Sequence, residues 1–337
     1  MMTRLIIVPA LILPVLFAGI AALALVNASQ SWTIRYTVRG WSFWSVHLVD
    51  LDRRLTLTVI PETAIANAPT VAPDNRAAAW DRSGLMALWD DLDTEPRELG
   101  PGDNPAWSPA GNQLVYHSAG ILQTIAPGDA EPRQLVSFRF NDFGMQAEIN
   151  PVWSPNGESL ALRVTYRNSV GIIRGADVFT ISAQGLRQRK IGGNTFTMAQ
   201  IPAWSPDSET LVISALNEGE RRIYTLSANG LRQQQRVNFA FPVQSLTWSP
   251  DGSRIAFASE ATGIRGIYVL ELADNRVRGP LEHDFGLSAR GGLAWSPDSR
   301  ALAFVASDRR GIFTLSVDDG LPRSISNPDG YTELLLP

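Results

Sequence analysis

The three histidines have the most obvious chemical potential in this chain, because imidazole binds metals and exchanges protons near neutral pH. His47 falls in an expected third strand of a repeat described below, His117 in a second strand, and His283 after a fourth strand. A shared site in such a repeat needs side chains from first strands or their loops. We therefore expect no metal site. The absence of cysteine from the sequence also excludes thiolate ligands, disulfides and cysteine nucleophiles.

Acidic and serine side chains give no stronger catalytic pattern. The groups at Asp50–Asp52 and Asp90–Asp93 fall where a third strand turns into a fourth, and aspartate is common in such turns. Neither group is followed by the glycine and distal glutamate of a calcium loop. The sequence has no G-x-S-x-G elbow, and no serine is followed by a histidine and an acid in a recognisable order. We predict a protein that is not an enzyme and has no cofactor.

Arginine recurs at the beginning of the expected fourth strands. The positions are Arg97, Arg133, Arg187, Arg232, Arg278 and Arg323. One interpretation is a basic rim for an acidic protein or an anionic glycan. The other is a solvated outer strand whose charges protect the sheet edge from pairing with another chain.

These residues are set in a repeat that is clear in the sequence. A phrase of the type "WSPDG" occurs five times, at Trp107, Trp153, Trp204, Trp248 and Trp295, at intervals of 44 to 51 residues. Such a period is typical of propeller blades or of arrays of paired helices. Short alternating runs such as "RIAFAS" and "IYVLEL" follow each phrase, without a sustained helical stripe. The repeat is therefore predicted to be β.

Each repeat is expected to form a four-stranded antiparallel meander. In Ser249–Gly252, proline suits the second position of a tight turn and glycine accepts the left-handed conformation that closes it. A sixth repeat begins at Ala68, with Val71 in the tryptophan position. The segment 31–60 supplies the second to fourth strands of a seventh repeat, and Thr332–Pro337 is predicted to supply its first strand. We expect seven blades, closed by pairing of the N- and C-terminal strands, with six blades as the alternative.

The N-terminus has a different composition. Leu5–Val26 contains no charged or polar side chain. As a helix it would reach roughly 33 Å, enough for a hydrocarbon core of about 30 Å. We predict a transmembrane anchor over residues 1–28 and a propeller over residues 31–337, with a cleaved signal peptide as the alternative.

The Trp-Ser-Pro-Asp/Asn-Gly/Ser phrase, with its following "IAF" and "IYVL" strands, resembles the WD40-like PD40 repeat of TolB-like β-propellers. The resemblance covers about residues 31–337. It implies a propeller, and for TolB itself it implies a periplasmic protein that acts through protein–protein contacts. The separate α/β domain of TolB is not seen in this sequence, which has the predicted anchor in its place.

Three irregular loops are candidates for binding, because rigid scaffolds display function on loops. They are residues 137–150, 166–177 and 282–292. The candidate partner-binding residues are Phe138, Arg139, Phe140, Phe143, Arg174, Phe285 and Arg290. Alternatively, the aromatic side chains pack under their own loops.

Together these patterns predict a non-catalytic protein-interaction module. We expect a single-pass protein of the cytoplasmic membrane, with its propeller on the periplasmic or extracellular side and a protein partner in the cell envelope. The net charge of −4 argues against a nucleic-acid partner. A sensor of glycans or peptides is the alternative, followed by a propeller lyase or hydrolase.

Overall fold

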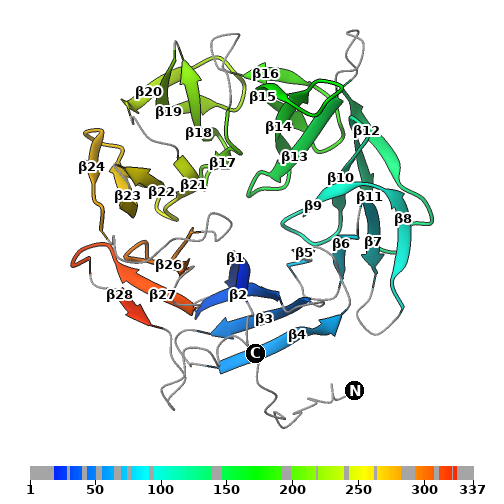
Figure 1. The fold of residues 1–337 in the computed structure, drawn as a ribbon, viewed down its shortest axis with the longest axis horizontal. Helices are drawn as coiled ribbons and strands as arrows, with labels where there is room; N and C mark the ends of the chain where they lie inside the picture. The colour runs from blue at the N-terminus through cyan, green and yellow to red at the C-terminus, as the bar shows by residue number, and fades with distance from the viewer. Residues whose placement is uncertain are drawn as a thin grey trace.

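The computed structural model describes residues 19–324, apart from gaps. The gaps are residues 29–30, 40–43, 51–54, 64–69, 74–76, 83, 91–94, 139–145, 192–198, 218, 239–242, 262–263, 282–292, 307–310 and 321. Every regular element in the described part is a β-strand. The strands form four-stranded antiparallel sheets, each in the order of the chain, set around a common centre (Figure 1). The predicted all-β fold is confirmed, and the arrangement is that of a β-propeller.

The described residues form seven such sheets. The first contains β1 (Gly19–Ala28), β2 (Ser31–Arg39), β3 (Trp44–Asp50) and β4 (Leu55–Thr63). The second contains β5 (Thr70–Val71), β6 (Ala78–Arg82), β7 (Leu85–Trp89) and β8 (Arg97–Pro101). The third contains β9 (Asp103–Trp107), β10 (Leu114–Ser118), β11 (Ile121–Ile125) and β12 (Arg133–Ser137).

The remaining sheets follow the same plan. The fourth contains β13 (Gln146–Trp153), β14 (Ser159–Arg167), β15 (Ile173–Ser182) and β16 (Arg189–Ile191). The fifth contains β17 (Ala203–Trp204), β18 (Thr210–Asn217), β19 (Glu220–Ser227) and β20 (Gln233–Asn238). The sixth contains β21 (Val243–Trp248), β22 (Arg254–Ala261), β23 (Ile264–Glu271) and β24 (Arg276–Arg278). The seventh contains β25 (Leu293–Trp295), β26 (Ala301–Ala306), β27 (Gly311–Ser316) and β28 (Pro322–Ser324).

The first sheet corrects one prediction. Its inner strand is β1, which pairs with β2 from Gly19 to Ala28, and the expectation that Thr332–Pro337 would take this place is wrong. A continuous apolar run fits a buried strand as well as a buried helix, so periodicity alone could not separate the two. The helix predicted over Leu5–Val26 is accordingly wrong for its part within β1, while residues 1–18 and Thr332–Pro337 lie outside the described residues. Among the residues that the structure describes, no helix is long and apolar enough to cross a membrane.

The turn between the first and second strands is held by its serine. In the sixth sheet, the Ser249 hydroxyl donates to Asp251 and accepts from the Arg254 backbone N–H, while Gly252 N–H donates to the Ser249 carbonyl. Gly252 has a φ of 73°, a conformation that glycine adopts without strain. The equivalent serines, Ser154, Ser205 and Ser296, close their own turns in the same way, because each hydroxyl accepts a backbone N–H from the start of the second strand. The recurring phrase therefore encodes a self-contained turn.

The tryptophan of the phrase joins one sheet to the preceding one. The preceding sheet has an equivalent position, which is again tryptophan except for Val71. The indole N–H donates to the backbone carbonyl of the residue directly before that position. The five bonds are Trp107 to Thr70, Trp153 to Ala106, Trp204 to Val152, Trp248 to Ala203, and Trp295 to Thr247, at 3.1 to 3.3 Å. The hydrophobic core is likewise divided into clusters that each combine two neighbouring sheets, such as Ala161 and Val178 with Trp204. The repeats are therefore stabilised mainly against each other.

Arginines of the outer strands add a second link between sheets. Arg189 donates to the Asn229 carbonyl and Arg278 to the Val317 carbonyl, each across to the next sheet. Arg97 binds both carboxylate oxygens of Asp90 and the carbonyls of residues 129 and 130 in the next sheet. Of these three, Arg97 and Arg278 belong to the arginine pattern of the sequence, and both hold turns in place, a role that neither interpretation of the pattern included.

Candidate functional site

The candidate partner-binding residues do not all lie in the described part of the chain. Arg139, Phe140, Phe143, Phe285 and Arg290 fall outside it, as does the loop 282–292. Only Phe138 and Arg174 can be placed.

Phe138 belongs to the hydrophobic core. Its side chain is 8% exposed and meets Phe179 edge to face, with ring centroids 4.9 Å apart. Its backbone N–H donates to the Gly120 carbonyl at 2.8 Å, which extends the pairing beyond β12. Phe138 therefore packs under its loop, as the alternative interpretation had it, and its ring is not available to a partner.

Arg174 lies on the long hairpin formed by β14 and β15. The two strands pair from Ser159 with Ser182 up to Arg167 with Ile173, and the register shifts between Tyr166 and Arg167. Arg174 is the extra residue at this shift, and its side chain is exposed. A bulge of this kind changes the direction in which a side chain points. Arg174 is thus displayed at the end of the hairpin.

The hairpin tip, residues 167–172, is ordered by its own hydrogen bonds. The Asn168 side-chain oxygen accepts the backbone N–H groups of Val170 and Ile172, and the Asn168 carbonyl accepts Gly171 N–H. Gly171 has a φ of 80°, so this turn requires a residue that tolerates the left-handed region. Arg167 closes the turn with a bond to the Gly171 carbonyl. The conformation of the tip is therefore fixed by hydrogen bonds within the tip itself.

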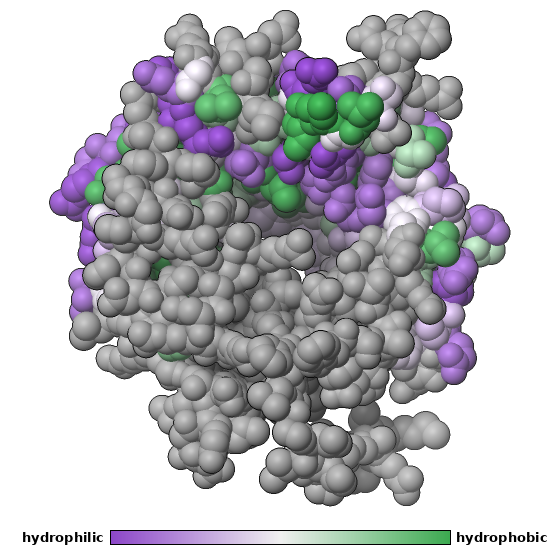
Figure 2. All heavy atoms as spheres, in the orientation of Figure 1, coloured by the Kyte–Doolittle hydropathy of each residue, from purple (hydrophilic) through white to green (hydrophobic). Residues whose placement is uncertain are grey.

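This ordered tip exposes two aliphatic side chains. Val170 is 74% exposed and Ile172 is 55% exposed, beside the exposed Arg174. Figure 2 shows that the described residues on one face of the molecule are mostly hydrophilic, with hydrophobic residues in small groups among them. An apolar pair next to a cation suits a contact with another protein, because such contacts bury aliphatic groups and favour arginine.

The base of the hairpin is held by a polar network. The Tyr166 hydroxyl donates to Asp177 at 2.7 Å, and Lys190, the only lysine of the sequence, contacts the same oxygen at 2.8 Å. Burial raises the pKa of Tyr166, and its hydrogen bond to Asp177 raises it further. The phenol therefore stays protonated and acts as a fixed donor.

A second pair supports the inner side of the same hairpin. Arg167 donates to Glu148 of β13 at 2.8 and 3.1 Å. Arg163 donates to the Ala199 carbonyl at 2.9 Å, and burial lowers its pKa. These contacts tie β14 to β13 and to the segment leading to the fifth sheet, so the hairpin stands on a rigid base.

His117 is the one histidine whose side chain the structure describes, and it lacks catalytic geometry. Its Nδ1 lies 2.8 Å from an Asp103 carboxylate oxygen, and its Nε2 accepts the Gly120 backbone N–H at 2.9 Å. An acid that orients an imidazole is half of a general-base arrangement, but here the second nitrogen is already occupied. His117 is 7% exposed and serves the β10–β11 turn. No group of three or more potential metal ligands occurs among the described residues.

The apolar tip was not named in advance, although its loop was. The candidate partner-binding residues predicted from the sequence are phenylalanines and arginines, and they do not include Val170 or Ile172. The available signal was two aliphatic residues either side of Gly171, in a segment that breaks the repeat. Whether such residues are buried depends on what packs over them, which periodicity does not reveal.

Comparison with known families supports the resemblance found in the sequence. Residues 143–279 match the family model described as PD40, TolB beta propeller domain. This match spans the fourth, fifth and sixth sheets.

Solved structures show the same fold at low identity. A putative TolB from Agrobacterium tumefaciens is 17% identical, with a TM-score of 0.51, over 84% of this chain and 88% of that one. An oligogalacturonate lyase from Vibrio parahaemolyticus is 14% identical, with a TM-score of 0.58, over 84% of each chain. The β-propeller domain of the Trilobed protease from Pyrococcus furiosus, described as having an open velcro topology, is 13% identical, with a TM-score of 0.59, over 94% of this chain and all of that domain. These similarities establish the fold alone.

Proposed function

We propose that this chain, in which residues 143–279 carry a TolB-type β-propeller domain, is a non-catalytic protein-interaction module of the cell envelope. The observation that carries the proposal is the β14–β15 hairpin tip, which holds Val170 and Ile172 exposed on an ordered turn. A preordered apolar contact loses less conformational entropy on binding than a flexible one. The partner is a protein that offers an apolar patch with a carboxylate for Arg174.

The pairing of two titratable side chains, His117 and Glu148, favours binding over catalysis. In His117 both ring nitrogens are engaged, and Glu148 is paired with Arg167. Groups that are saturated in this way hold the scaffold in shape. The rival proposals, a ligand sensor or a channel enzyme, would require unpaired polar groups that converge on one point.

We also propose that the molecule is tethered to the outer side of the cytoplasmic membrane through Leu5–Val26. This run is uncharged, which suits a membrane span. In the structure, residues 19–26 belong to β1, and the same residues cannot form a strand and a membrane helix at once. Without them the run is too short to cross, so anchoring requires β1 to leave the first sheet.

For the ring itself, the proposal is a seven-bladed propeller whose seam blade contains β2, β3 and β4, with β1 as its inner strand in the form of the molecule in which residues 19–28 stay in the sheet. In support, β1 lies against β25 and β26 of the last sheet. Among the described residues, which end at Ser324, all four strands of this blade come from the N-terminal part of the chain.

The interaction is tested by capture from native membranes with a photo-crosslinker in place of Ser169, on the full-length chain. We expect one dominant crosslinked protein, and at least a tenfold loss of it when Val170→Asp and Ile172→Asp are combined. Leu186→Asp is the matched control, because Leu186 is 65% exposed on a turn of the same sheet. Equal loss in both variants, or crosslinks unaffected by the tip substitutions, would refute a specific role for the tip.

Membrane anchoring is tested separately. Alkaline carbonate extraction of membranes should leave the full-length chain in the membrane pellet. Release into the supernatant would show that the anchor proposal is wrong.

A further inference from the structure

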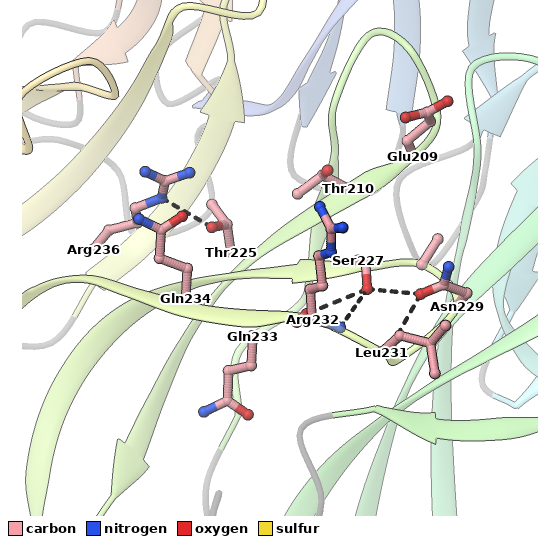
Figure 3. Close-up of a pocket in the computed structure, with 11 residues that line it drawn as sticks. Glu209, Thr210, Thr225, Ser227, Asn229, Leu231, Arg232, Gln233, Gln234 and Arg236 are labelled. Carbon is pink, nitrogen blue, oxygen red and sulfur yellow. Dashed lines mark hydrogen bonds between the residues drawn. The ribbon is translucent and has the colours of Figure 1, made fainter.

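A groove of about 1030 Å³ lies on the outer part of the fifth sheet, along β19 and β20 (Figure 3). We call it the outer groove and define it by Thr225, Ser227, Asn229, Arg232, Gln234 and Arg236. Related grooves line the fourth sheet, at about 680 Å³, and the third sheet, at about 200 Å³. Because the sheets are repeats of one another, the larger volume at the fifth sheet needs a local cause.

The two sheets differ at one register position, and we take this difference as the cause. In the fourth sheet, Arg189 stands opposite Thr180, and both donate to the next turn: Arg189 to the Asn229 carbonyl and Thr180 to the Ala228 carbonyl, each at 2.9 Å. In the fifth sheet, Gln234 stands opposite Thr225 instead. Its shorter, neutral side chain makes no such bond among the described residues.

The arginine of the fifth sheet lies two residues further along the strand. Arg236 Nε donates to the Thr225 hydroxyl at 2.9 Å, as Figure 3 shows, and its Nη1 reaches the Leu272 carbonyl only at 3.5 Å. The arginine that contacts the sixth sheet is therefore Arg236, and not the residue at position 234, where the repeat would place it. No arginine stands opposite Thr225 in this junction, whereas Arg189 stands opposite Thr180 in the preceding one.

The groove is basic in a chain whose net charge is −4. Arg232 is exposed, and its guanidinium has no partner among the described residues. Its backbone N–H donates to the Ser227 hydroxyl, and this bond fixes the backbone from which the side chain extends. Glu209 is the one carboxylate among the described lining residues. The remaining lining groups are largely amides and hydroxyls, which can donate hydrogen bonds to an anionic ligand.

Two further features favour an extended chain as the occupant. β20 is the outermost strand of its sheet, so one edge of its backbone is open to pairing. Leu231, at the turn that leads into β20, is 79% exposed, in place for an apolar side chain of a bound segment.

We infer that the outer groove binds an acidic, extended peptide segment of a partner protein, with carboxylates paired to Arg232 and Arg236 and backbone groups aligned along β20. The inference rests on the proposed function, since it assigns a second contact surface to an interaction module. Charge-assisted pairs with arginine are stronger and more directional than neutral hydrogen bonds.

The test uses the full-length chain in detergent and a fluorescein-labelled ten-residue peptide of alternating glutamate and serine. A matched peptide of alternating glutamine and serine is the charge control. We expect saturable binding of the acidic peptide alone, weakened at least tenfold by Arg232→Glu and weakened by added salt. Arg187→Glu is the matched control variant, because Arg187 occupies the same turn position in the fourth sheet. Equal weakening in both variants would overturn the inference in favour of a diffuse basic rim.

Gln234→Arg separates groove binding from surface charge. It adds a positive charge, so diffuse attraction would strengthen binding of the acidic peptide. It also places an arginine at the position that Arg189 occupies in the fourth sheet, where its side chain would close the outer groove. Our inference therefore requires that the acidic peptide bind this variant more weakly. Tighter binding of this variant contradicts it.

A third arm replaces the peptide with oligogalacturonate, an anionic glycan. Binding of the glycan but not of the peptide would overturn the inference. Failure of the peptide to bind, while the Val170 and Ile172 variants still abolish partner capture, refutes the outer groove alone. If the peptide fails to bind and the Val170 and Ile172 variants also leave partner capture unchanged, the proposed function is refuted as well.

Discussion

The junctions between sheets fall into two kinds. From the second sheet to the seventh, each junction has an indole that reaches back to a backbone carbonyl and a shared apolar cluster. At the first sheet the tryptophan of this bond has no equivalent on either side, because β5 has Val71 where later sheets have tryptophan, and β1 contains no tryptophan. The repeated indole bond therefore links the sheets from the second to the seventh, and the two junctions of the first sheet depend on other contacts.

The largest expected effect comes from the tryptophan itself. Trp204→Ala removes a buried ring, 7% exposed, together with its bond to Val152, and should lower the free energy of unfolding by about 3–5 kcal/mol. Val71→Ala, at the equivalent position of the second sheet, should cost about 1–2 kcal/mol because only two methyl groups are lost. Denaturant unfolding monitored by circular dichroism measures both, and equal losses would abolish the distinction between the two kinds of junction.

The next effect concerns the arginine link between the second and third sheets. Arg97→Gln should lower stability at neutral pH by about 1–2 kcal/mol, because Asp90 and two backbone carbonyls lose a charged donor. Arg174→Gln is the control, since Arg174 is exposed and should cost nothing measurable.

This second effect should depend on pH in a defined direction. Burial alone would raise the pKa of Asp90, but hydrogen bonds from Arg97 and from Gly128 N–H hold it below its ordinary value. A lowered pKa contributes stability above the ordinary value of about 3.9, and this contribution is lost as the pH falls through the folded-state pKa. The gap in stability between wild type and Arg97→Gln should therefore narrow between about pH 5 and pH 2. A gap that stays constant with pH would show that Asp90 does not contribute.

A smaller effect is expected where serine replaces glycine in the turn. Ser208 and Ser299 have φ values of 64° and 61°, yet each hydroxyl accepts a backbone N–H from the preceding sheet, that of Asn156 and Asp251 respectively. Ser208→Ala keeps the strain and loses the bond, at a cost of about 0.5–1.5 kcal/mol. Ser208→Gly loses the bond but relieves the strain, so thermal unfolding should place it between alanine and wild type.

The smallest expected effect is electrostatic. The Ser205 hydroxyl and the Glu209 backbone N–H hold the pKa of Asp207 below its ordinary value. Ser205→Ala should raise this pKa toward the ordinary value, which a carbon-detected NMR titration of the carboxyl would resolve. The pKa of Asp298, whose own serine is untouched, should not move.

Contacts within a repeat could be predicted from the sequence, and contacts between repeats could not. The phrase at Trp248 predicts the turn, its glycine and the strands on either side, since all of these are local in the chain. The carbonyls that receive Trp204 and Arg189 lie 52 and 40 residues away. Such partners are known only when neighbouring sheets are placed together.

The same limit explains the errors at the site and at the seam. Phe138 was a candidate contact because aromatic residues favour interfaces, but its neighbour Phe179 comes from the next sheet and buries it. Gly19–Ala28 was expected in a helix because an uncharged apolar run has no period that separates a buried strand from a helix. In both cases the burial or the conformation depends on which other sheets or strands pack against the residues, and the local sequence does not contain this information.

The backward direction of the indole bonds has a consequence for biosynthesis. Every such bond has its donor later in the chain than its acceptor. As the polypeptide leaves the ribosome, each new sheet therefore finds its docking surface already made, and assembly can follow the order of translation. The exception is the opening sheet, which must wait for the last one to be synthesised before its free side is covered.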